Sequence, residues 1–190
     1  MSESHRSATT VTPIRAVASI MVGVLAAPDA SAFAIPQKLA RWRRLTPLAT
    51  WAPIELAELS HAGIFYGVAA ALDRFAMVPR HLILLGEGPV ARSALELVLP
   101  GALPCGGIVF IDVFYGALPF RIVPTATAIR LVVHQNGSQR SPDTLTGALR
   151  AADLDARIIN LNTAGDCATG AAASAAATIG RQARDGAGNR

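Results

Sequence analysis

The pattern that most constrains the fold is a repeated alternation of short apolar runs with longer segments of helical periodicity. Apolar runs of about 4–8 residues are typical of strands buried on both faces, and helices between such runs connect parallel strands. The expected strands lie at 16–25, 48–56, 81–86, 106–113, 128–135 and 156–162. The expected helices lie within 31–45, 60–78, 89–99, 141–154 and 168–184. The sequence therefore predicts an α/β fold, with a mostly parallel sheet and helices on both faces.

The composition is that of one globular domain. Of the 190 residues, 52% are hydrophobic and only 16% are charged, so the chain can bury a sizeable core and is not generally disordered. We expect a flexible lead at 1–12, a single domain at 13–180 and a flexible tail at 181–190.

Charge and cysteine content exclude several classes of partner. The formal net charge of +4 comes almost wholly from scattered arginines. Their only cluster is "RWRR" at 41–44, and a solvated helix face explains it as well as a nucleic-acid contact does. Cys105 and Cys167 form no C-x-x-C or Cys/His spacing. We therefore expect no nucleic-acid partner, no metal site and no disulfide framework.

The N-terminal segment 15–34, "RAVASIMVGVLAAPDASAFA", has two interpretations. An arginine, an apolar run and an A-x-A-like end outline a secretory signal peptide. The apolar run is too short to span a bilayer, however, and it suits a strand buried on both faces. We favour the strand, because the rest of the chain needs it, and we expect a cytoplasmic protein. A secreted protein is the alternative, if residues 1–34 are a signal peptide.

The stretch "HLILLGEGPVARSALELV" at 81–98 is a strand, a glycine turn and a helix. Gly86-x-Gly88-x-x-Ala91 matches the glycine pattern of Rossmann dinucleotide-binding proteins, and Asp112 ends the next strand, where a ribose-binding acid would lie. Asp112 follows Gly86 by 26 positions, whereas about 20 are expected. Two strand–helix units also precede the motif. Dinucleotide binding is therefore the weaker of two interpretations.

The other interpretation rests on several matches in the right order. The segment 81–113 has a strand, a sharp turn, a helix and the strand "GGIVFIDV", and "YGALPF", "IRLVVHQNGSQRSP" and "LTGALRAADLDARIINL" follow it. Over residues 14 to 180 this order resembles the α/β-hydrolases of the phospholipase/carboxylesterase type. The resemblance implies a compact three-layer α/β sandwich, with 86–90 as the nucleophile elbow G-x-S-x-G.

The same resemblance implies that the catalytic triad is degenerate. Gly88 stands where the elbow has its serine, Ser138 lies in the segment that should hold the acid, and Asp166 stands where histidine is expected. No histidine follows His134, so the family's chain order of Ser, Asp or Glu, and His cannot be completed. Pro89, which has no N–H, follows the nucleophile position and removes one oxyanion donor.

The remaining candidates are side chains expected at the carboxyl ends of strands. Glu87 is either an acid/base group or a carboxylate that complements the dipole of the following helix. Asp166 and Cys167 are either a relocated acid and nucleophile or a capping residue and a buried thiol. The candidates for ligand contact are Leu25, Glu87, Gly88, Pro89, Asp166 and Cys167.

Three functions follow. The first is a pseudoenzyme that binds a small apolar ligand or a protein at the former active site. The second is a hydrolase or another enzyme with a rebuilt site, and the third is dinucleotide binding at 86–91. We favour the first, with no cofactor, no membrane association and a homodimer left open.

Overall fold

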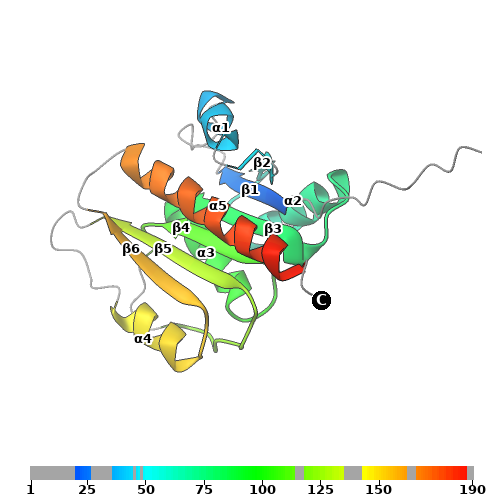
Figure 1. Ribbon diagram of the computed structural model, residues 1–190. Coiled ribbons are helices and arrows are strands. Elements are labelled where there is room, and N and C mark those ends of the chain that lie inside the picture. Colours follow the sequence, from blue (N-terminus) through cyan, green and yellow to red (C-terminus); the bar gives the residue numbers. More distant parts are fainter. Residues whose placement is uncertain are drawn as a thin grey trace, which may run out of the picture.

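The computed structural model describes residues 20–26, 36–44, 46–47, 49–113, 118–134, 143–161 and 166–187 (Figure 1). Within these residues one six-stranded sheet has the order β2-β1-β3-β4-β5-β6, and each neighbouring pair is parallel. The strands are β1 (Ile20–Ala26), β2 (Ala49–Glu55), β3 (Leu82–Glu87), β4 (Gly107–Ile111), β5 (Ala128–His134) and β6 (Ala156–Leu161). The predicted α/β fold with a parallel sheet is confirmed.

The N-terminal apolar run forms strand β1. All seven of its residues are buried, and β1 pairs with β2 on one side and with β3 on the other. Val22, for example, is in register with both Trp51 and Ile83. The prediction of a core strand in this segment is confirmed.

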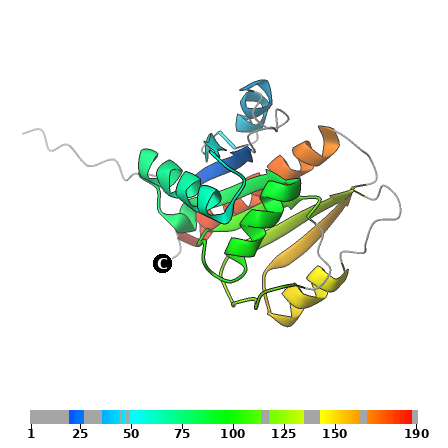
Figure 2. The ribbon, with the colours of Figure 1, turned by 180° about the vertical axis from the view of Figure 1, so that it is seen from behind.

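Helices cover both faces of the sheet (Figures 1 and 2). Helices α1 (Pro36–Arg43) and α5 (Asp166–Ala187) lie over one face, and α2 (His61–Arg74), α3 (Gly88–Val98) and α4 (Asp143–Ala151) lie over the other. Because successive strand residues point to opposite faces, Leu84 belongs to the core under α2 and α3, whereas Ile83 belongs to the core under α5. The expected three layers are therefore present.

Helix ends follow local signals. Ser60 caps α2 as predicted, with its Oγ accepting a hydrogen bond from the N–H of Gly63 at 2.9 Å. The helix ends at Arg74, four residues before the predicted boundary, because Ala76 adopts a left-handed conformation with φ of 50°. Helix α5 continues to Ala187, three residues beyond the predicted helix end at residue 184, and the predicted domain boundaries stay a prediction.

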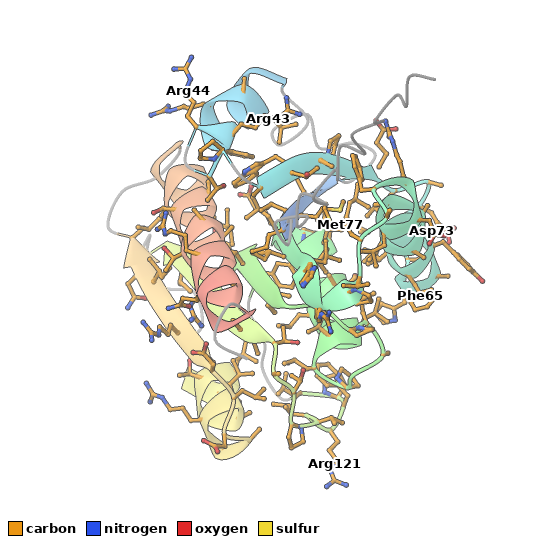
Figure 3. The ribbon with its side chains drawn as sticks, turned by 45° about the vertical axis from the view of Figure 1, so that its right-hand side comes forward. Arg43, Arg44, Phe65, Asp73, Met77 and Arg121 are labelled. Atoms are coloured by element: carbon orange, nitrogen blue, oxygen red, sulfur yellow. The ribbon has the colours of Figure 1, made fainter. Side chains whose placement is uncertain are left out.

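The arginine cluster lies on α1. Trp42 is only 3% exposed and packs on Trp51, with ring centroids 5.9 Å apart, so it anchors the helix. Arg41, Arg43 and Arg44 are exposed, and Figure 3 shows Arg43 and Arg44 on the outer side of the molecule. Arg43 also donates a hydrogen bond from Nη2 to the carbonyl of Trp51 at 3.3 Å, and the absence of a nucleic-acid partner stays a prediction.

The strand order places a topological switch point between β1 and β3. From β1 the chain moves outward to β2, and it then returns to the other side of β1 to form β3 before continuing through β4, β5 and β6. In open parallel sheets, ligands bind outside the carboxyl ends of the strands at such a point. A ligand site is therefore expected at the carboxyl end of β3.

Candidate functional site

Strand β3 passes directly into helix α3 at the switch point. β3 ends at Glu87 and α3 begins at Gly88, with no intervening residue. Gly88 has φ of 59°, a left-handed conformation that glycine adopts at little cost and that strains most other residues. A sharp strand-to-helix turn with a left-handed φ at its apex is the geometry of a nucleophile elbow.

The two glycines of the turn, Gly86 and Gly88, differ in how closely other atoms surround them. A Cβ on Gly86 would be in ordinary van der Waals contact with Cβ of Ala91 and with Cδ1 of Leu25, each at 3.4 Å, so α3 and β1 closely surround this glycine. A Cβ on Gly88 would have no heavy atom of the described residues within 4 Å. Among the described residues, none therefore fills the place of a side chain at Gly88.

Three other predicted residues lie at or beneath this turn. Glu87 is the half-buried N-cap residue of α3, but its side chain makes no capping hydrogen bond. Pro89 is exposed in the first turn of α3, one position later than predicted, since the helix begins at Gly88. Leu25 is 1% exposed and belongs to the core. Leu25 therefore packs beneath the elbow, and its role as a ligand contact stays a prediction.

Asp112 lies at the same edge of the sheet. It follows β4, whose Ile111 is in register with Glu87, and its N–H donates a hydrogen bond to the carbonyl of Val132 at 2.9 Å. Asp112 has φ of 52°, an uncommon value for a residue with a side chain. The sequence singled out Asp112 only for the dinucleotide hypothesis, and no local signal indicated this backbone conformation.

The structure gives less information on the other predicted site residues, Ser138, Asp166 and Cys167. Asp166 and Cys167 are the first two residues of α5, which follows β6, but their side chains lie outside the described part of the structure. Ser138 lies outside the described residues altogether. The structure therefore places Glu87, Gly88 and Pro89 together at the elbow and leaves the contacts of Ser138, Asp166 and Cys167 as predictions.

The described residues offer neither a cluster of metal ligands nor a membrane-spanning helix. Among those residues, no three His, Cys, Asp or Glu side chains gather in a way that could hold a metal ion. No helix in the same part of the chain has both the length and the hydropathy to cross a bilayer.

Solved structures share this arrangement of strands and helices. Esterase PE8 superposes with a TM-score of 0.62 at 15% identity, covering 84% of this chain and 92% of its own. The chain has an α/β-hydrolase fold. The Bacillus cereus carboxylesterase superposes with a TM-score of 0.60 at 9% identity, covering 86% of this chain and 88% of its own. For the Mesorhizobium loti carboxylesterase the TM-score is 0.57 at 15% identity, and the coverage is 86% of this chain and 87% of that one.

Sequence comparison adds no closer relative, since neither a family model nor a curated protein matches the chain. At these levels of identity the likeness establishes the α/β-hydrolase fold, and activity has to be argued from the site itself.

Proposed function

We propose that this protein is a non-catalytic member of the α/β-hydrolase fold that binds a small apolar molecule or a protein partner at the carboxyl edge of the sheet beside Gly88. The observation that carries the proposal is the elbow itself. Its backbone has the left-handed φ of 59° at Gly88, yet the residue there has no side chain to act as a nucleophile.

The neighbouring positions support the same conclusion. Pro89 has no backbone N–H, so the residue after the apex cannot donate to an oxyanion. No histidine follows His134 in the sequence, and a triad of this fold needs its histidine last in chain order. The nucleophile, one oxyanion donor and the base are thus replaced together, whereas the strand–turn–helix scaffold is kept.

Space at the apex favours binding over a purely structural elbow. No heavy atom of the described residues comes within 4 Å of a Cβ built on Gly88, and ligands of parallel sheets bind at this edge of a switch point. A ligand or a partner side chain can therefore approach the backbone closely at this glycine.

A test of activity separates this proposal from a rebuilt enzyme. A serine-directed fluorophosphonate probe should not label the protein, and short-chain p-nitrophenyl esters should not turn over above background, with a serine esterase as positive control. Restoring the serine alone, as Gly88→Ser, should also fail. An unactivated hydroxyl is a weak nucleophile, and the loss of one oxyanion donor costs about 10²–10³ in rate in other enzymes.

Ester hydrolysis by the unmodified protein would contradict the proposal. If Glu87→Gln, Asp166→Asn or Cys167→Ser then abolished that hydrolysis, the rebuilt-site enzyme would take its place. A thermal shift with NAD, NADP or FAD would instead favour dinucleotide binding at 86–91. The absence of a cofactor, the cytoplasmic location and the homodimer stay predictions.

A further inference from the structure

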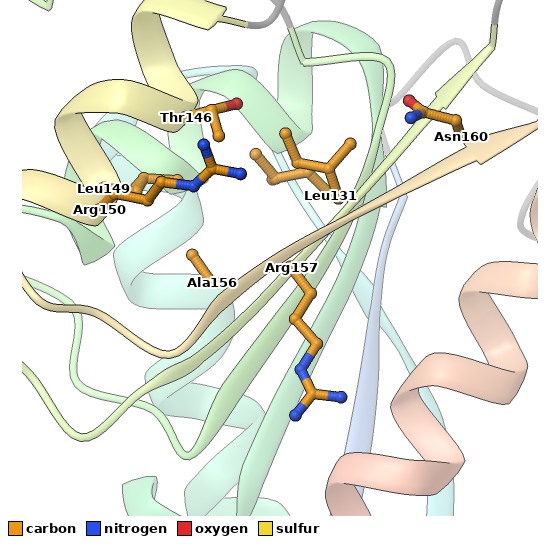
Figure 4. Close-up of a pocket in the computed structure, with 8 residues that line it drawn as sticks. Leu131, Thr146, Leu149, Arg150, Ala156, Arg157 and Asn160 are labelled. Atoms are coloured by element: carbon orange, nitrogen blue, oxygen red, sulfur yellow. The ribbon is translucent and has the colours of Figure 1, made fainter.

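A pocket of about 480 Å³ lies away from the elbow, between helix α4 and the last two strands of the sheet (Figure 4). Its lining comes from β5, α4 and β6. Strand β4 and strand β5 separate β6 from β3, so this pocket is distinct from the site beside Gly88. Its volume is within the range of small-molecule sites, about 300–1,000 Å³.

The floor of the pocket is apolar. Leu131 of β5 and Leu149 of α4 are 2% and 1% exposed, and Ile158 of β6 packs partly buried against the same core. Leu131 and Leu149 are almost fully covered, so the apolar surface that a ligand can reach comes from the half-buried Ala156 and Ile158 of β6. These two side chains offer a short hydrocarbon group a small apolar surface.

Two arginines line the pocket, Arg157 from β6 and Arg150 from α4. Arg150 is exposed in the last turn of α4, and Figure 4 shows its side chain reaching into the space between Thr146 and Leu131. Among the described residues, no carboxylate pairs with Arg150. Asn160 also lines the pocket and adds an amide that can hydrogen-bond to an anion.

Arg130 shows how this fold uses an arginine for structure alone. Its side chain is 6% exposed, and its guanidinium binds both carboxylate oxygens of Asp155, at 3.1 and 3.0 Å. Arg150 has no such partner in the described part of the chain, although it lies on a concave surface. A guanidinium is always charged and its planar fork matches a carboxylate, so a pocket of this kind favours an anion.

We propose that this pocket binds a small organic carboxylate with a short hydrocarbon chain. The carboxylate pairs with the guanidinium of Arg150. The hydrocarbon chain lies on Ala156 and Ile158. The proposal does not rest on the function proposed for the elbow, because none of these residues lies there.

Titration of the ¹⁵N-labelled protein with hexanoate tests the site. Hexanoate should cause saturable shifts in the amide resonances of α4 and β6, while hexanol and hexylamine of the same chain length should cause much weaker ones. Arg150→Gln should weaken hexanoate binding at least about tenfold, because a charge-assisted hydrogen bond is lost. The affinity of Arg150→Lys for hexanoate should lie between those of the unmodified protein and Arg150→Gln, because lysine keeps the charge but lacks the planar guanidinium.

The matched control is Arg121→Gln, which removes an equal charge from an exposed arginine that does not line the pocket. This variant should bind hexanoate as the unmodified protein does. Three outcomes would overturn the proposal: no saturable shift, equal shifts with hexanol, or equal weakening by both glutamine variants. Shifts centred on the residues around Gly88 would assign the carboxylate to the elbow instead and would also overturn it.

Discussion

At the scale of single residues, the thiol of Cys105 is enclosed where the chain enters β4. Its residue is 7% exposed, and the hydroxyl of Thr127 donates a hydrogen bond to the Cys105 carbonyl at 2.8 Å. Burial raises the pKa of the Cys105 thiol to about 12, against an ordinary value of 9.0, although hydrogen bonds from Thr127 and Gly107 act in the opposite direction. The reactive thiolate is therefore nearly absent at neutral pH.

In a Cys167→Ser variant, which leaves Cys105 as the only thiol, we expect no reaction with a disulfide reagent until the protein is unfolded in urea. The unfolded chain loses the thiol proton above pH 9.0 while the folded chain keeps it to about 12, so stability should also fall across this alkaline range. Rapid labelling of the folded variant at neutral pH would show that the thiol is accessible.

At the scale of elements, helix α5 depends on small side chains. Ala172, Ala173 and Ala176 are 0% exposed and Ala177 is 2% exposed, and they pack over the central strands. Ala176→Leu should destabilise the protein by about 1–3 kcal/mol in urea unfolding, because the added atoms have no space. Ser174→Leu, on the exposed side of the same helix, should change stability by no more than about 0.5 kcal/mol. Equal effects of the two variants would mean that α5 does not pack closely on the sheet.

The elements also show where sequence reasoning succeeds. Fully buried parallel strands are continuous apolar runs, so β3 and β4 were predictable to within one or two residues. The elbow was predictable because two glycines and a proline separate a strand pattern from a helix pattern. The end of α2 was not predictable, because alanine rarely adopts a left-handed conformation and the sequence gives no sign of the φ of 50° at Ala76. The pocket was not predictable either, since it depends on how far α4 lies from Leu131 and Ile158 in space.

At the scale of the whole molecule, the sheet depends on β1. This strand pairs on both sides, with β2 and with β3, and all seven of its residues are buried. Deleting residues 1–34 should therefore abolish the cooperative unfolding transition and the near-ultraviolet dichroism of the protein. Deleting only residues 1–12 is the control, and it should leave both signals intact. A stable, soluble product of the longer deletion would return the segment to the signal-peptide interpretation.

The central place of β1 also has a consequence for how the chain is made. β1 leaves the ribosome before the other described strands, and its neighbours follow only with residues 49–55 and 82–85. Until Leu85 has emerged, at least one edge of a seven-residue strand without a single charge lacks its native hydrogen-bonding partner. Apolar strands with unpaired edges readily associate with other chains. A strand that is buried on both faces and paired on both edges in the folded protein thus stays incomplete until β3 has been made.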